Sequence, residues 1–129
     1  MQKRVLLAED EPNIVTSLRF LLERAGFAVD VWDNGAAACT EALRQPPDLL
    51  ILDVMLPEMD GIEILRRVRA DKGASRTPVI VLTAKGVRET QETALAAGAD
   101  AFITKPFSNA DVIAAAERLT GAASAARSS

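Results

Sequence analysis

The 129-residue sequence contains no histidine and only one cysteine, Cys39. Without histidine the chain cannot form a Ser-His-Asp or Cys-His catalytic arrangement, the usual zinc sites, or a phosphohistidine of its own. A single cysteine cannot form an intrachain disulfide, which fits a reducing compartment. We therefore expect a cytoplasmic protein that uses neither histidine nor a disulfide in its chemistry.

The sequence also lacks a long hydrophobic segment near its N-terminus, where only residues 5–8 form an apolar run before acids begin. This run is too short for a signal peptide or a membrane span, so we expect no membrane partner. The net charge of −3 gives no electrostatic reason to bind phosphate backbones, and we predict no direct nucleic acid binding. We expect the one basic cluster to be a solvated helix face. Its members are Arg66, Arg67, Arg69, Lys72 and Arg76.

The length and composition suit one globular domain. The hydrophobic share is 49% and the charged share 26%, which are ordinary values for a soluble chain that buries a core. We predict that residues 1–120 form this domain. Residues 121–129 are small and of low complexity, and we predict a flexible tail or the start of a linker.

Short apolar runs alternate with segments of helical spacing along the chain. The runs predict strands at residues 4–8, 28–32, 49–53, 79–82 and 101–104. Helical spacing predicts helices at about 12–25, 34–43, 87–97 and 109–119, and another after Asp60-Gly61. This alternation predicts an α/β fold with a doubly wound, five-stranded parallel sheet. Right-handed crossovers give the flavodoxin-like order 2-1-3-4-5.

The third predicted strand ends in a carboxylate. Four large aliphatic residues, Leu49–Leu52, run directly into Asp53. An apolar run without alternation is typical of a strand buried on both faces, so Asp53 is expected at the mouth of the core. A carboxylate placed there costs free energy unless another group pairs with it.

The other predicted strands end in groups that can pair with Asp53. The first strand ends at Glu9-Asp10, the fourth at Thr83 and the fifth at Lys105. The carboxyl ends of parallel strands meet at one edge of the sheet, where three carboxylates would repel one another. Carboxylates with a backbone carbonyl and waters suit Mg²⁺. Acids, Mg²⁺, a lysine and a hydroxyl favour phosphoryl chemistry, with Asp53 as the nucleophile.

Each of these residues has a simpler interpretation when taken alone. An acid after a strand is often a helix cap, and Asp10 or Glu11 could cap the helix that begins at Pro12. Thr83 could be an ordinary strand-end residue, and Lys105 a surface lysine. The coincidence of four such placements at one edge favours the functional interpretation.

Four segments of the sequence resemble the receiver domain of bacterial response regulators. They are residues 5–11, 50–61, 79–84 and 97–107, and the resemblance covers about residues 3–119. It implies a two-component signalling role, with a sensor histidine kinase or a histidine phosphotransfer protein as the partner that supplies the phosphoryl group. It also implies an output protein or effector domain that the receiver domain controls. Apart from self-phosphorylation and autodephosphorylation, it implies no enzymatic activity.

The resemblance assigns roles to particular residues around the cation. Asp53 corresponds to the aspartate that accepts the phosphoryl group. Glu9 and Asp10 correspond to the acidic pair that binds Mg²⁺, and Met55 would contribute its backbone carbonyl. The first acid is Glu where Asp is commoner, which lengthens the reach to the metal.

The resemblance also assigns residues around the phosphoryl group. Thr83 and Lys105 would contact its oxygens, with Ala84 beside them, and Pro106 matches a cis-proline that aims the lysine. Phe102 takes the place of an aromatic switch residue that moves inward when Thr83 is drawn toward the phosphoryl group. A plain core role for Phe102 remains open. Phosphorylation would change the face built from the helix at 87–97, the strand at 101–104 and the helix at 109–119.

The resemblance makes a homodimer through the same face possible, although Ala114–Ala116 stand where many DNA-binding regulators carry charged dimerisation residues. Two rival functions also remain. A small phosphatase with an aspartate nucleophile typically needs a second acid two residues after the nucleophile, and this sequence has Met55 there. A receiver-like interaction module could signal without phosphorylation.

Overall fold

The computed structural model describes residues 2–84 and 88–121. Its strands are β1 (Arg4–Ala8), β2 (Ala28–Trp32), β3 (Leu49–Asp53), β4 (Val79–Ala84) and β5 (Ala101–Lys105). Its helices are α1 (Pro12–Arg24), α2 (Gly35–Arg44), α3 (Gly61–Ala70), α4 (Arg88–Ala96) and α5 (Asn109–Thr120). Residue 87, where we predicted a helix to begin, and residues 122–129 of the predicted tail lie outside the described residues.

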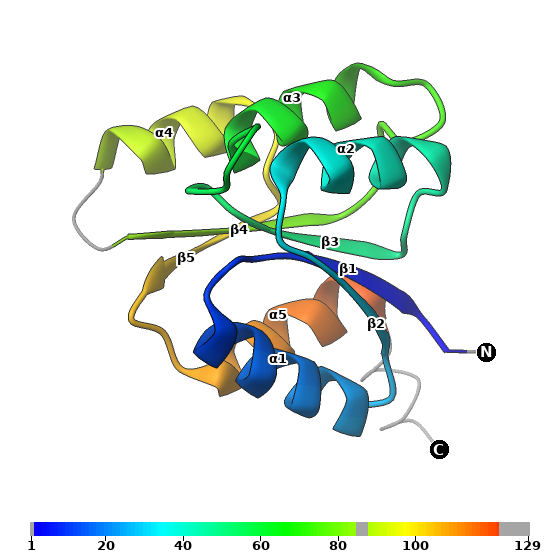
Figure 1. The fold of residues 1–129 in the computed structure, drawn as a ribbon, viewed down its shortest axis with the longest axis vertical. Helices are drawn as coiled ribbons and strands as arrows, with labels where there is room; N and C mark the ends of the chain where they lie inside the picture. Colours follow the sequence, from blue (N-terminus) through cyan, green and yellow to red (C-terminus); the bar gives the residue numbers. More distant parts are fainter. Residues whose placement is uncertain (1, 85–87, 122–129) are drawn as a thin grey trace.

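The five strands form one parallel sheet in the order β2-β1-β3-β4-β5, which confirms the predicted topology. Helices α2, α3 and α4 cover one face of the sheet, and α1 and α5 cover the other (Figure 1). This is the three-layer arrangement of a flavodoxin-like fold. The strand order reverses direction between β1 and β3, and ligands of such sheets bind at this switch point.

Strand β3 is buried at all five positions, as its continuous apolar sequence predicted. Its alternate side chains enter two separate cores. Leu50 and Leu52 join the core beneath α2, α3 and α4, whereas Leu49 and Ile51 join the core above α1 and α5. Because β3 is covered on both faces, its carboxyl end is buried and so is Asp53.

Side-chain caps begin several of the helices. The Asn34 carboxamide accepts a hydrogen bond from Ala37 N–H at 3.0 Å, as predicted for α2, and Asp60 caps α3 in the same way. The N-cap residue of α1 is Glu11, and its side chain makes no capping hydrogen bond. The capping interpretation of Glu11 is therefore not supported. Among the described residues, no helix has the length and apolar character needed to cross a membrane.

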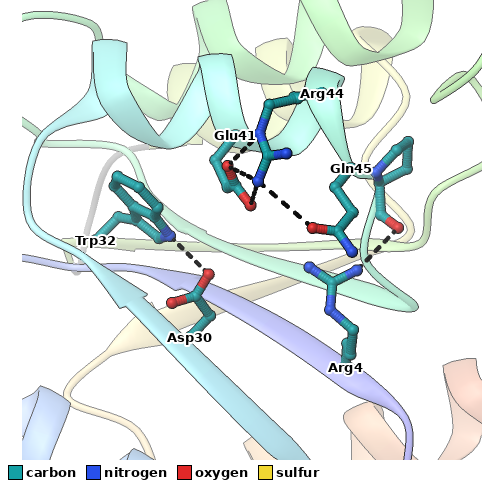
Figure 2. Close-up of polar contacts among 7 residues, drawn as sticks. Arg4, Asp30, Trp32, Glu41, Arg44 and Gln45 are labelled. Atoms are coloured by element: carbon teal, nitrogen blue, oxygen red, sulfur yellow. Dashed lines mark hydrogen bonds and ion pairs between the residues drawn. The ribbon is translucent and has the colours of Figure 1, made fainter.

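Strand β2 lies at the edge of the sheet, as its weak alternation predicted. Trp32 Nε1 donates to Asp30 Oδ2 at 3.0 Å, and these two side chains share one face of the strand because they are two residues apart. On α2, Arg44 makes hydrogen bonds of 2.9 Å to the Glu41 carboxylate (Figure 2). Such partly exposed pairs contribute little to stability. We therefore assign no functional role to the Trp32–Asp30 and Arg44–Glu41 contacts.

The basic cluster within residues 66–76 only partly matches its prediction as a solvated face. Four members are exposed, but the Arg69 guanidinium is bound at distances between 2.7 and 3.1 Å. Its acceptors are the backbone carbonyls of Ser75, Thr77 and Gly98 and the carboxylate of Asp100. Arginine offers five donors in a fixed fork, and Arg69 uses them to join α3 to the segments that precede β4 and β5.

Candidate functional site

Buried polar residues gather at one end of the sheet. Among the described residues, the buried polar or charged side chains are those of Glu9, Asp53, Thr77 and Thr83. Glu9 follows β1, Asp53 ends β3, and Thr83 is the next-to-last residue of β4. Burying polar or charged groups without a partner is costly, so two carboxylates and a hydroxyl buried at the carboxyl edge of neighbouring strands mark a site.

Both carboxylate oxygens of Asp53 have a partner. Oδ1 accepts a hydrogen bond from the Met55 N–H at 3.2 Å, and Oδ2 accepts one from Lys105 Nζ at 3.1 Å. The start of α3 lies against the main chain of Asp53. A Cβ at Gly61 would lie only 2.5 Å from the Asp53 carbonyl oxygen. Only glycine lets the helix start so close to the end of β3.

The Glu9 side chain is fully buried and folds back on its own backbone. Its Oε2 accepts hydrogen bonds from the N–H groups of Asp10 and Glu11, each at 3.1 Å. Its Oε1 lies 3.2 Å from Lys105 Nζ but accepts no hydrogen bond. Burial, with the nearby Asp53 carboxylate, raises the pKa of Glu9 to about 7.

An acidic cluster of three carboxylates forms as the sequence predicted. Glu9, Asp10 and Asp53 can each offer one oxygen, and these oxygens lie within 4.8 Å of one another. The buried Glu9 Oε1 has no hydrogen bond of its own, and hard carboxylate oxygens are the ligands that Mg²⁺ prefers. The cluster is therefore compatible with Mg²⁺. Met55 lies two residues after Asp53 in the sequence, and it is 73% exposed.

Lys105 balances the charge of the acidic cluster. Burial acts to lower the pKa of Lys105, but the hydrogen bond to Asp53 and the charges of Asp53 and Glu9 outweigh this effect and raise it. The lysine therefore stays cationic. The Lys105–Pro106 peptide bond is cis, as the resemblance implied.

The remaining predicted residues lie on β4 and β5. Ala84 pairs with Lys105 in the sheet, and Thr83 pairs with Thr104. Phe102 stands two positions before Thr104, so it shares a face of the sheet with Thr83. Phe102 is half-buried and packs against the core under α2, α3 and α4. Its packing agrees with the core role, and the switch roles of these residues stay predictions.

A groove beside the site was not predicted from the sequence. It encloses about 490 Å³ between the start of α1 and the segment that joins β5 to α5. Its lining residues are Glu11, Asn13, Ile14, Ser17, Lys105, Pro106, Phe107 and Asn109. No sequence signal marks it, because two segments about 90 residues apart form its walls. Through Lys105 the groove reaches the acidic cluster.

A doubly wound parallel sheet with an acidic cluster at its switch point and a lysine from its last strand defines the receiver class of signalling domains. The family model of the response regulator receiver domain matches residues 5–117. The chain belongs to this family, which confirms the resemblance seen in the sequence. It is a receiver domain of the two-component response regulators.

Individual relatives agree with this assignment. The chain is 42% identical over 87% of its length to the alkaline phosphatase synthesis transcriptional regulatory protein PhoP of Bacillus subtilis, and it covers 46% of that protein. It is 41% identical over 88% of its length to the phosphate regulon transcriptional regulatory protein PhoB of Rhizobium meliloti, covering 50% of it. The chain therefore spans about half the length of these relatives.

One similar solved structure contains a magnesium ion. The receiver domain of the sensor histidine kinase PA1611 from Pseudomonas aeruginosa superposes with a TM-score of 0.85 at 32% identity. The match covers 94% of this chain and 99% of that one. That structure has a magnesium ion coordinated in its active site cleft.

The prediction of no direct nucleic acid binding is wrong. PhoP and PhoB are transcriptional regulatory proteins, and the chain matches only about half of each. The prediction rests on the net charge of the chain. Net charge describes the surface of the receiver domain and does not decide what transcriptional regulators with such a domain bind.

Proposed function

We propose that this receiver domain accepts a phosphoryl group on Asp53 from a sensor histidine kinase or a histidine phosphotransfer protein, in the cytoplasm and with Mg²⁺. Glu9, Asp10, Asp53 and the backbone carbonyl of Met55 would hold the cation. The observation that carries the proposal is the convergence of a buried nucleophile, two further acids and Lys105 at the switch point of the sheet.

The residues of the chain have distinct parts in the proposed transfer. An Asp53 carboxylate oxygen attacks the phosphorus, and the bond to the donor's imidazole nitrogen breaks with its electron pair returning to that nitrogen. Lys105 already hydrogen-bonds Asp53 Oδ2 and would move to neutralise a phosphoryl oxygen. Bound Mg²⁺ would supply further neutralisation of the phosphoryl oxygens.

Phosphorylation would then change the surface of the domain. Thr83 and the backbone of Ala84 would contact the phosphoryl group, and Phe102 would respond on the same face of the sheet. The added charge would shift an equilibrium between two arrangements of the α4, β5 and α5 face. We propose a transcriptional output for this switch, because PhoP and PhoB are transcriptional regulators.

The two rival functions are weaker. A phosphatase would turn over phosphomonoesters, yet Met55 occupies the position where a general acid is required. A module that works without phosphorylation would have no use for a buried nucleophile paired with Lys105, which costs free energy to maintain. Self-phosphorylation from small phosphodonors and slow autodephosphorylation by water are the only reactions we expect.

Binding of beryllofluoride, which mimics a phosphoryl group, tests the proposal. Addition of beryllofluoride with Mg²⁺ is expected to shift the amide resonances of Thr83 and Phe102, and omission of Mg²⁺ is expected to prevent the shifts. Asp53→Asn is the matched control, because it keeps the shape of the side chain but removes its charge. Equal shifts in that variant, or none in the unmodified chain, would contradict the proposal.

A further inference from the structure

The first residue of α2 lies against the loop that follows Asp53. Residues 54–60 form this loop, the 54–60 loop. The Gly35 N–H donates to the Pro57 carbonyl at 2.9 Å. A Cβ at Gly35 would lie 2.7 Å from the Met59 carbonyl carbon and would overlap the Met59 carbonyl oxygen. Real Cβ atoms do not approach backbone so closely, so any side chain at this position must displace the loop or α2.

The 54–60 loop turns sharply at the point where Gly35 touches it. The Pro57 carbonyl also accepts the Met59 N–H at 2.9 Å, which closes a three-residue turn around Glu58. Glu58 has a φ of 71°, and a non-glycine residue rarely adopts this conformation. Such backbone persists only when its surroundings hold it, and the Gly35 N–H is one of the groups that do so.

The two ends of the 54–60 loop are fixed independently of Gly35. The Val54 N–H donates to the Leu82 carbonyl at 2.9 Å, and the Val54 carbonyl accepts the Gly61 N–H at 3.0 Å. Leu56 is buried in the core. Displacement of the tip at residues 57–59 would therefore be taken up in the short stretches between the tip and these two fixed ends. The stretch on the Val54 side contains Met55, whose N–H donates to the Asp53 carboxylate.

We propose that Gly35 is a positioning residue for the cation site. By admitting the Met59 backbone against the first turn of α2, it holds the 54–60 loop so that the Met55 backbone stays beside Asp53. The inference rests on the proposed function, in which the Met55 carbonyl binds Mg²⁺. Gly35 itself touches neither the cation nor the phosphoryl group and acts only through the loop.

The test measures Mg²⁺ affinity by isothermal titration calorimetry in the whole chain and three variants. Gly35→Ala is expected to weaken Mg²⁺ binding about tenfold, in line with other residues that support metal ligands. Gly73→Ala is the matched glycine control, since a Cβ there meets only Asp71 Oδ2 at 3.4 Å. Val68→Ala removes buried volume from α3 and controls for a general loss of stability. Both controls are expected to keep the affinity within twofold of the parent chain.

A second measurement needs no variant. If the 54–60 loop must hold its position for Mg²⁺ to bind, Mg²⁺ must in turn stabilise that position. Hydrogen exchange of the Gly35 amide, which donates to Pro57, is then expected to slow when Mg²⁺ is added. The Thr77 amide, which donates to Ala74 in another loop, serves as the internal reference and is expected to keep its rate.

The outcomes separate the inference from the proposed function. Unchanged Mg²⁺ affinity in folded Gly35→Ala overturns the inference alone, as does an equal loss in Val68→Ala. If Gly35→Ala does not fold, unchanged exchange at Gly35 in Mg²⁺-saturated parent chain overturns it. A parent chain that does not bind Mg²⁺ overturns the proposed function, and the inference with it.

Discussion

Lys105 Nζ donates to Asp53 Oδ2 at 3.1 Å, although the two residues are 52 positions apart in the sequence. Lys105 ends β5 and Asp53 ends β3, and β4 lies between these strands in the sheet. The lysine therefore reaches across the end of a strand to its partner. The pair forms only after three parallel strands have assembled, so it couples the chemistry of the site to the complete fold.

Lys105→Met is expected to lower the free energy of unfolding at pH 7 without Mg²⁺ by about 2 kcal/mol, because it leaves the buried Asp53 carboxylate without its counter-charge. Urea denaturation measures this loss. Lys72→Met, at an exposed lysine, is the control and is expected to change little. Equal stability of both variants would show that Lys105 does not compensate the acidic cluster.

The raised pKa of Glu9 predicts a pH dependence of stability. The folded chain keeps the Glu9 proton up to about pH 7, whereas the unfolded chain releases it near the ordinary glutamate pKa of 4.5. Between these values the folded state binds more protons, so stability falls as pH rises. The fall contributed by Glu9 is expected to reach up to about 3 kcal/mol in Mg²⁺-free buffer. Denaturation curves from pH 4.5 to 7.5 measure it.

Glu9→Gln is the matched variant for this prediction, because it keeps the shape of the side chain but cannot ionise. Its stability is expected to vary less over the same pH window than that of the parent chain. Mg²⁺ is expected to flatten the profile of the parent chain as well, since the cation takes the place of the proton. Parallel profiles for the parent chain and Glu9→Gln would contradict the assigned pKa shift.

Arg69→Met is expected to destabilise the fold by about 3 kcal/mol, because three carbonyls lose the guanidinium donor together and the Asp100 carboxylate keeps only its hydrogen bond from the Val79 N–H. Arg66→Met changes an exposed arginine of the same helix and is expected to cost less than about 0.5 kcal/mol. Arg69→Lys is expected to recover little, since an ammonium cannot reproduce the fork of donors. Thermal or urea unfolding of the three variants measures the difference. Equal effects of Arg66→Met and Arg69→Met would contradict this role.

Much of the fold was predictable because single residues carried strong local signals. The run Leu49–Leu52 predicted a strand covered on both faces, and such a strand must be central in the sheet. Asn34 predicted the start of α2 through the capping preference of its side chain. The handedness of parallel crossovers then limited the strand order to very few choices. Residues that end parallel strands meet at one edge, so the acidic cluster was predictable too.

Other features had no sequence signal because tertiary structure supplies the partner. Arg69 has the same sequence surroundings as its exposed neighbours, and only the fold brings the carbonyls of residues 75, 77 and 98 to it. Gly35 at the start of α2 has no distinctive sequence surroundings, because only the fold brings the Met59 backbone against it. The hydrogen bonds from the Asp10 and Glu11 N–H groups to the Glu9 carboxylate form in a site that is buried only in the folded chain. The net charge was a poor criterion for nucleic acid binding, because it describes only the surface of this domain.

Mass spectrometry of the intact chain after incubation with a small phosphodonor and Mg²⁺ tests the central claim most directly. We predict one acid-stable, alkali-labile acyl phosphate per chain, which requires Mg²⁺ and maps to the peptide that contains Asp53. We predict none in Asp53→Asn, whose amide is not a nucleophile for this transfer. Full labelling of Asp53→Asn, or of the parent chain at another residue, would contradict the assignment of Asp53 as the phosphoryl acceptor.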